Sequence, residues 1–318
     1  MIGNINLASD ASWDQTATTI AGLANGTKGS SSSQLYLPRG MTITNNDVLY
    51  IADTNNHRIV VVDLDSFSNN FIINSDRGFG SSITQFKSPH DVIIVNMSLY
   101  VLERDNYRVK KLSLNGSDPT RALHYDDKKT PVYFYVDEDA NIYIADDDNN
   151  RVLRYHSNES SFIVVAGTGS KGSRNDQLNK PFGIFVNRIG TIYIADHDNH
   201  RIMKWMKHAT SGIRVAGDGT KGDRATQLNQ PIYVTVDTNE YMYISEADNH
   251  RITRWAPNST AGVCIAACTG KNGQLSNQLF KPVSLAFDSS GSLYVSDENN
   301  NRIQKFSILS HFGEYFTD

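Results

Sequence analysis

The sequence predicts an all-β fold: a six-bladed β-propeller of four-stranded antiparallel blades, closed by the N-terminal strand joining the last blade. Three observations support this prediction. A phrase of ten residues recurs six times, short runs rich in Val, Ile and Tyr alternate with Gly, Asn and Asp turns, and no stretch shows sustained helical periodicity. A period of about 50 residues indicates a repeat architecture, in which each unit buries its apolar faces against its neighbours.

The recurring phrase is an apolar run with a central Tyr that ends in an acid, followed by a polar turn and an Arg. The six Tyr residues are Tyr50, Tyr100, Tyr143, Tyr193, Tyr243 and Tyr294. The acids are Asp53, Glu103, Asp146, Asp196, Glu246 and Asp297, and each precedes an Asn by three positions and an Arg by five. Asn tolerates left-handed backbone and Arg pairs with a carboxylate across a hairpin, so we expect this trio to build the turn rather than to catalyse.

The strands of each repeat follow in a fixed order. A first strand is expected to begin at each of Pro38, Pro89, Pro131, Pro181, Pro231 and Pro282, because Pro loses no ladder bond at the start of a strand. The second strand is apolar at nearly every position, which indicates a sheet covered on both faces. Third-strand residues Val62, Leu112, Tyr155, Trp205, Trp255 and Phe306 are expected to be core between blades. A Gly-rich connector follows the fourth strand, except before Pro131, where Asp126-Asp127-Lys128-Lys129 predicts a notch in the ring.

The ends of the chain supply the closure. Residues 16–22 match a fourth strand, whereas only a third strand follows Arg302. We therefore expect an N-terminal lead-in over 1–15, a single propeller over 16–308 and a C-terminal tail over 309–318.

Composition restricts the function only weakly. Hydrophobic content of 39% is that of a globular protein, and a net charge of -4 gives no global attraction to nucleic acid or anionic membrane. No membrane span or signal peptide is visible, which leaves the compartment open between cytoplasm and a secreted protein without its leader. Cys264 and Cys268 would lie about 13 Å apart along a strand, too far for a disulfide, so two free thiols are expected.

Three of the phrases resemble the NHL repeat. Residues 50–58, 193–201 and 243–251 each begin Tyr-Ile and end acid-x-x-Asn-His-Arg, and residues 165–181 are similar to that family's linker. The resemblance covers Thr16 to Ile308 and implies a six-bladed propeller, in a family that includes binding modules and a peptidyl amidating lyase.

An enzyme of that lyase type is the alternative to a binding module. The resemblance implies zinc held in the central channel by histidines that follow the strand-opening Pro, and a catalytic zinc needs three protein ligands. Here the residues after each Pro are Arg39, His90, Val132, Phe182, Ile232 and Val283. Only one is a His, and no Gly-x-Ser-x-Gly or His-Glu-x-x-His motif is present. We therefore expect no catalytic residue, no metal ligand and no cofactor.

The two positions after each Pro predict a binding site at the channel mouth. Its candidates are Arg39, His90, Asp91, Tyr133, Phe182 and Tyr233. Aromatic and Arg side chains at a concave centre are typical anchors for a partner, although filling of the narrow channel is an equal alternative. The favoured prediction is a monomeric, non-catalytic scaffold that docks a protein or peptide.

The loop face around the mouth supplies further candidates: Lys28, His57, Tyr107, Lys171, His200, Lys221, His250 and Lys271. Basic charge interleaved with aromatic rings is also the footprint of a single-stranded RNA site, which is the alternative partner. Asp residues on the same rim offset that charge and favour the protein or peptide partner over RNA.

Overall fold

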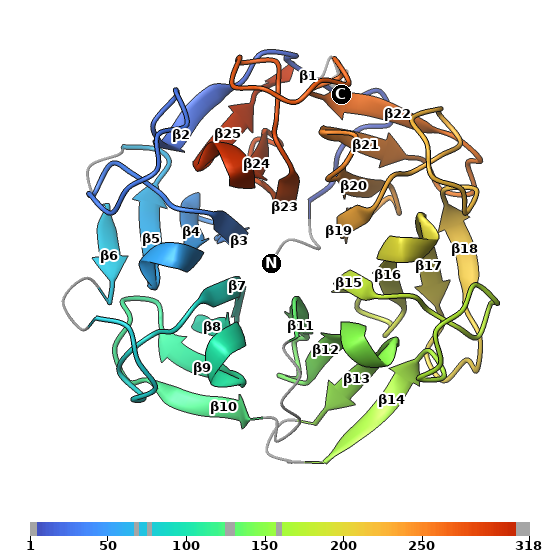
Figure 1. Ribbon diagram of the computed structural model, residues 1–318, viewed down its shortest axis with the longest axis horizontal. Helices are drawn as coiled ribbons and strands as arrows, with labels where there is room; N and C mark the ends of the chain where they lie inside the picture. The colour runs from blue at the N-terminus through green and yellow to red at the C-terminus, as the bar shows by residue number, and fades with distance from the viewer. Residues whose placement is uncertain (1–4, 67–69, 75–77, 125–130, 157–160, 310–318) are drawn as a thin grey trace, which may run out of the picture.

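The computed structural model describes residues 5–66, 70–74, 78–124, 131–156 and 161–309, and shows six blades around a central axis (Figure 1). Each blade is a four-stranded antiparallel sheet whose first strand lies nearest the axis and whose fourth lies at the rim. The described residues include no α-helix, only short 3-10 turns. The predicted fold class is confirmed.

The blades follow one another along the chain. Blade 1 is β3 (Pro38–Ile43), β4 (Val48–Asp53), β5 (Arg58–Asp63) and β6 (Phe71–Ile73), and blade 2 is β7 (Pro89–Val95), β8 (Ser98–Glu103), β9 (Arg108–Ser113) and β10 (Thr120–His124). Blade 3 is β11 (Phe134–Val136), β12 (Ile142–Asp146), β13 (Arg151–Tyr155) and β14 (Phe162–Ala166), and blade 4 is β15 (Pro181–Val186), β16 (Ile192–Asp196), β17 (Arg201–Trp205) and β18 (Ile213–Ala216). Blade 5 is β19 (Pro231–Val236), β20 (Met242–Glu246), β21 (Arg251–Trp255) and β22 (Gly262–Ala266). Blade 6 is β23 (Pro282–Phe287), β24 (Leu293–Asp297), β25 (Arg302–Phe306) and β2 (Thr18–Gly22).

The ring is closed by the N-terminal strand. In blade 6, β2 pairs antiparallel with β25, so that Thr18 lies opposite Lys305 and Gly22 opposite Arg302. A second, shorter pairing precedes it, between β1 (Ser12–Trp13) and β26 (Ile308–Leu309). The closure predicted from the unpaired third strand is thus confirmed, and the lead-in contributes structure of its own.

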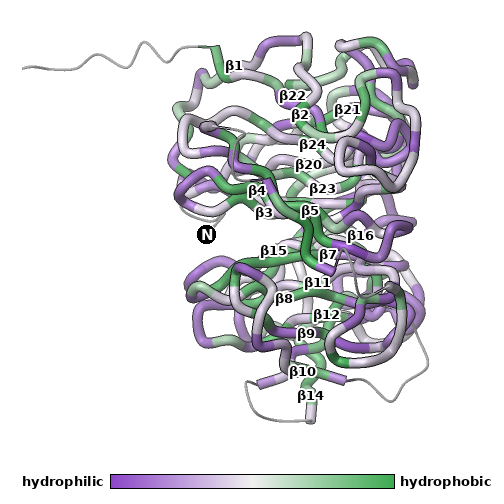
Figure 2. The backbone as a smooth tube through the Cα atoms, turned by 90° about the vertical axis from the view of Figure 1, so that its left-hand side faces the viewer, coloured by the Kyte–Doolittle hydropathy of each residue, from purple (hydrophilic) through white to green (hydrophobic). Residues whose placement is uncertain are grey.

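The hydrophobic core is divided among the interfaces between blades. The predicted third-strand residues Tyr155, Trp205, Trp255 and Phe306 are all 5% exposed or less, as are Val62 and Leu112 in the other blades. The second strands are buried along nearly their whole length, as expected for sheets covered on both faces. Seen from the side, the apolar segments run through the middle of the disc and the polar ones form the loops on its faces (Figure 2).

One sequence expectation is corrected by the structure, and others concern residues that the structure does not describe or boundaries that it does not test. Five of the six Pro residues begin a first strand, but β11 begins at Phe134 rather than at Pro131. The predicted notch at 126–129 and the tail residues 310–318 lie outside the described residues. The segment boundaries at 15 and 309 stay a prediction.

The prediction of free thiols is wrong. Cys264 and Cys268 form a disulfide with a Cα–Cα distance of 5.7 Å. The estimate of about 13 Å assumed one continuous strand. In the structure β22 ends at Ala266, and Ala267 adopts left-handed backbone with φ 53°. This turn brings Cys268 back toward Cys264.

Candidate functional site

The acid–Asn–Arg trio clamps each described Gly-rich connector to its blade. In blade 1, Arg58 Nε donates to Asp53 Oδ2 at 2.7 Å, and the two Nη atoms donate to the carbonyls of Ser30, Ser31 and Gln34. Asn56 Nδ2 donates to both Asp53 Oδ2 and Gly29 O. The trio is therefore structural, as the sequence predicts.

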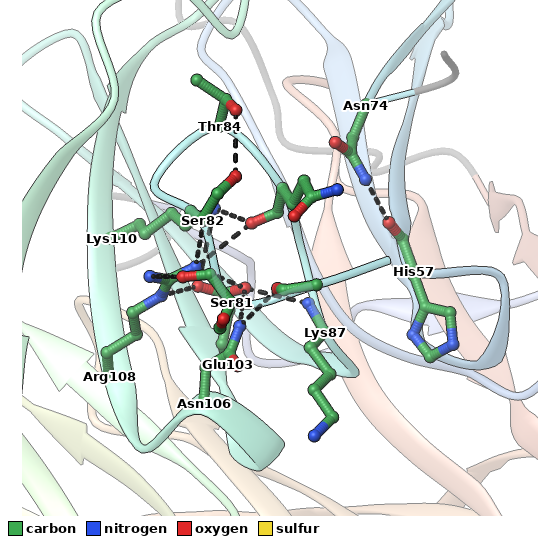
Figure 3. A network of polar contacts seen from close by, with 12 residues as sticks. His57, Asn74, Ser81, Ser82, Thr84, Lys87, Glu103, Asn106, Arg108 and Lys110 are labelled. Carbon is green, nitrogen blue, oxygen red and sulfur yellow. Dashed lines mark hydrogen bonds and ion pairs between the residues drawn. The ribbon is translucent and has the colours of Figure 1, made fainter. Parts of the chain in front are cut away.

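Blade 2 shows the same clamp at close range (Figure 3). Arg108 pairs with Glu103 and donates to the carbonyls of Ser81 and Ser82, while Asn106 donates to Glu103 and to Gly80 O. Lys110, buried under the connector, also lies 3.5 Å from Glu103. Blades 4, 5 and 6 repeat the bond from Asn to the connector Gly, whereas the counterpart in blade 3 would involve residues outside the described ranges.

In five of the six blades the residue before the Arg forms a second contact, between neighbouring blades. His57, His200 and His250 have left-handed backbone, and their Nδ1 atoms accept the main-chain N–H of Ser88, Gln230 and Lys281 at 3.0, 3.2 and 3.4 Å. Asn150 and Asn301 accept the equivalent N–H of Lys180 and Leu37 through Oδ1. Burial lowers the pKa of all three histidines, which favours the neutral, accepting form. We call these contacts the interblade latches.

The other loop-face candidates have separate surroundings. Lys28, Lys171, Lys221 and Lys271 are exposed, and Lys28 lies over the Tyr36 ring at 4.5 Å. Tyr107 is half-buried and has the same left-handed backbone as the latch histidines. The structure therefore places these candidates on one face without gathering them into a single pocket.

The channel-mouth candidates do meet at the axis. Arg39 Nη1 lies 2.7 Å from His90 Nε2, and the His90 ring contacts Tyr133 edge-on at 5.8 Å. Tyr133 in turn contacts Phe182 and Tyr233 at 6.2 and 6.0 Å. His90 and Tyr133 are 1% exposed and Tyr233 is 8% exposed, so these rings fill the channel. Arg39 and Phe182 are half-buried and reach the mouth.

Asp91 lies one layer deeper, beside Gly40. A side chain at Gly40 would place its Cβ 2.1 Å from Asp91 Oδ1, so only Gly allows β3 and β7 this approach. Burial raises the pKa of Asp91 to about 8, although the amides of Val92 and Phe134 oppose the shift. Its carboxyl is therefore largely protonated at neutral pH and adds little negative charge to the channel.

A second ring of side chains surrounds the mouth, and sequence reasoning missed it. It is formed by the residue that directly follows each acid: Thr54, Arg104, Asp147, His197, Ala247 and Glu298. Five of them open the 3-10 turns η2 (Thr54–Asn56), η3 (Arg104–Asn106), η4 (Asp147–Asn149), η5 (His197–Asn199) and η6 (Glu298–Asn300). The signal was in the sequence, because this position varies between blades while the trio around it is constant.

This ring interlocks with the first strands. Arg39 Nη2 lies 2.6 Å from Glu298 Oε1, and the His197 ring lies 4.3 Å from Phe182. His197 Nδ1 is also 2.8 Å from Asp198. Burial, and then the charge of Asp148, raises the pKa of Asp147 to about 6. The mouth thus presents both signs of charge beside a partly exposed aromatic surface.

No group of three or more His, Cys, Asp or Glu side chains within the described ranges is arranged to hold a metal ion. Among the same residues, no helix has the length and apolar character needed to cross a bilayer.

Comparison with known proteins identifies the repeat. Residues 35–62 and 281–306, which span most of blades 1 and 6, match the NHL repeat. The chain is a six-bladed β-propeller with NHL repeats at these two positions. None of the curated proteins matches this propeller by sequence.

Solved structures share the architecture of the NHL-repeat propeller. A protein of unknown function from Bacteroides thetaiotaomicron is similar with a TM-score of 0.72 and 15% identity, covering 94% of this chain and 77% of that one. A gluconolactonase from Xanthomonas campestris has a TM-score of 0.62 at 12% identity, with 96% and 99% covered. A virginiamycin B lyase from Staphylococcus aureus has a TM-score of 0.58 at 11% identity, with 92% and 98% covered. At these identities the likeness shows the fold alone.

Proposed function

We propose that this NHL-repeat propeller is a non-catalytic scaffold that binds a protein or peptide at its channel mouth and the surrounding connector face. One observation carries the proposal. The blade-constant side chains are engaged in connector clamps and interblade latches, whereas the partly exposed side chains that differ between blades gather at the mouth. Function in repeat scaffolds usually resides on such loop positions.

The chemistry of the mouth suits a polypeptide. The Arg39–Glu298 ion pair and the Phe182–His197 ring pair lie on opposite parts of one rim, with Arg104 and Asp147 between them. A peptide can offer complementary charges and an apolar side chain to such a rim. Because clamps and latches already hold the rim, binding orders few additional side chains.

Single-stranded RNA is the alternative ligand, supported by the exposed lysines Lys28, Lys171, Lys221 and Lys271. The histidines expected to stack on bases hold the latches instead. RNA binding, if present, would fall steeply between low and moderate salt, because Lys–phosphate contacts release counterions.

An enzyme acting at the mouth is the second candidate. Asp147, with its pKa raised to about 6 by burial, is half-buried on the rim and fits the requirement for a general base near neutral pH. Asp147→Asn would abolish such an activity while leaving the fold intact, so activity toward a panel of lactones and esters that survives this change contradicts this candidate.

The binding proposal is tested by cross-linking capture with the intact chain, followed by titration of the purified partner. Arg104→Ala with His197→Ala should reduce partner affinity at least tenfold, because both side chains reach the mouth. Lys111→Ala, an exposed residue of β9, is the matched control and should change the affinity less than twofold. Capture of no polypeptide, or equal affinity of all variants, contradicts the proposal.

A further inference from the structure

The face opposite the connectors carries a groove with a volume of about 890 Å³. It is lined mainly by blades 3 and 4 and extends to Thr42, Ile94 and Val236 on the first strands of blades 1, 2 and 5. Blade 3 lines it with Tyr143 and Arg154, and blade 4 with Val186, Gly190 and Met206. The turns 137–141 and 187–190 border the opening of this groove. These turns lie at the ends of the strands farthest from the connectors, so the groove is separate from the channel mouth.

The equivalent groove between blades 5 and 6 is occupied by the chain itself. Residues 5–13 run through it, and Ile5 O accepts the main-chain N–H of Thr238. The Trp13 ring lies 6.0 Å from Tyr243 and 6.1 Å from Phe287, and its Nε1 donates to Gly291 O at 2.9 Å. Trp13 is only 2% exposed. This groove therefore holds an extended peptide through one buried aromatic side chain.

Arg254 recognises the backbone of that segment. Its Nη2 donates to Ala8 O at 2.8 Å, and its Nη1 donates to Ser9 O at 3.1 Å and to Ala11 O at 3.3 Å. The guanidinium also lies 5.9 Å from the Trp13 ring. A planar fork of donors can engage successive carbonyls in this way, which a Lys ammonium cannot reproduce.

Blade 3 repeats this recognition set at the same positions. Tyr143 lies opposite Arg154 in the β12–β13 ladder, as Tyr243 lies opposite Arg254 in the β20–β21 ladder. In both blades the Tyr hydroxyl donates to the Asp six residues earlier, at 3.3 Å in blade 3 and 2.9 Å in blade 5. The residues opposite the Tyr in the other ladders are Val61, Lys111, Lys204 and Lys305. Blades 3 and 5 are thus the two blades with Arg at this position.

In blade 3 no peptide segment engages the arginine. Within the described residues the Arg154 guanidinium contacts the Tyr143 hydroxyl and His156 Nε2, and no main-chain carbonyl accepts a hydrogen bond from its Nη atoms as in blade 5. The Nε atoms of Arg154 and Arg254 are both buried without a hydrogen-bond partner, so the two blades differ at the Nη atoms. Apolar side chains also remain exposed around the groove: Ile163 at 49%, Val164 at 47%, Ile189 at 68% and Met206 at 46%. A cluster of exposed apolar side chains around a concave site indicates a surface that a partner covers.

We propose that the groove between blades 3 and 4 binds an extended segment of a partner polypeptide. The segment presents an aromatic side chain to Tyr143 and successive main-chain carbonyls to Arg154, with small residues before the aromatic as in Ala8–Trp13. Val186 stands where blade 6 has Phe287, which leaves room for a large ring. This inference is independent of the function proposed above, which uses the opposite face.

The test uses a fluorescein-labelled synthetic peptide of residues 5–15 as the probe and the intact chain as receptor, with fluorescence anisotropy as the readout. The chain's own segment keeps the 5–6 groove occupied because it is covalently linked and therefore at high effective concentration. We expect saturable binding, weakened at least tenfold by Arg154→Ala and at least threefold by Arg154→Lys. The same peptide with Trp13→Ala should also bind at least tenfold more weakly.

Lys204→Ala is the matched control, because Lys204 occupies the equivalent position in blade 4, and it should change the affinity less than twofold. No saturable binding, or binding that Arg154→Ala leaves unchanged, overturns the proposal. Sedimentation of the chain alone tests whether a second copy of the chain fills the groove. A dimer that Arg154→Ala dissociates would show that a second copy fills the groove, which overturns the assignment to a partner polypeptide.

Discussion

Blades 3 and 5 carry the same Tyr–Arg–Asp set and use it differently. In blade 5, Arg254 is 6% exposed and binds three carbonyls of the N-terminal segment. In blade 3, Arg154 faces an open groove. Blade 5 also has a disulfide where blade 3 has Val164 and Thr168, and a histidine latch where blade 3 has Asn150. The proposal above thus assigns the same repeat position to stability in blade 5 and to recognition in blade 3.

The largest expected change in unfolding free energy comes from removing the Trp13 side chain from the groove between blades 5 and 6. Trp13→Ala should destabilise the protein by about 4 kcal/mol, because it removes a buried aromatic and leaves a cavity. Denaturant unfolding measures the loss. Leu309→Ala, half exposed in the adjoining β26, should cost less than about 1 kcal/mol. A cost below about 1 kcal/mol for Trp13→Ala would show that the segment is not held in this groove.

The two arginines give the sharpest matched pair. Arg254→Ala should cost about 3 kcal/mol, because buried carbonyls of residues 8, 9 and 11 lose their donor. Arg154→Ala should change the unfolding free energy by less than about 0.5 kcal/mol, since its groove is open. Equal costs for the two variants would remove the distinction between the blades.

Reduction of the disulfide tests the reinforcement of blade 5. Cys264 and Cys268 are separated by four positions, and closing so short a loop is worth about 2 kcal/mol. A reducing agent should lower the unfolding free energy of the wild type by this amount and leave that of Cys264→Ala with Cys268→Ala unchanged. Equal responses of the two proteins contradict this contribution.

The smallest effect concerns the latches. Burial lowers the pKa of His250 in the folded state, so its neutral form stabilises the fold above the unfolded value of about 6.5. This contribution is lost as the pH falls through the folded pKa. His250→Asn gives blade 5 the latch residue of blade 3, and Asn does not titrate. Between pH 8 and pH 5 the unfolding free energy of this variant should therefore fall by about 0.5 kcal/mol less than that of the wild type. Unfolding curves of both proteins with identical pH dependence would contradict the latch.

The sequence was sufficient for the ring and its closure because these depend on periodic signals. Six copies of the Tyr phrase locate the second strands, and the unpaired strand after Arg302 requires a partner. The role of the trio also followed, since a residue needed in every blade supports the fold. Third-strand aromatics such as Trp205 and Trp255 are buried as predicted.

Features that depend on single residues could not be predicted from the repeat period. The left-handed backbone at Ala267 brings Cys264 and Cys268 close enough for a disulfide, and Ala is not a residue type that indicates such a backbone. The latch role of His57 and His200 depends on an N–H from the next blade, which sequence spacing does not show. The lead-in has no repeat signal, yet Leu7 and Trp13 are each 2% exposed. Its binding to blade 5 became visible only in the structure.

A crystal structure of the intact chain with an excess of the residue 5–15 peptide tests the central claim most directly. The account predicts a second copy of the segment between blades 3 and 4, with its Trp ring against Tyr143 and its carbonyls bonded to Arg154. A groove that stays empty at saturating peptide, or a peptide bound elsewhere, would contradict it.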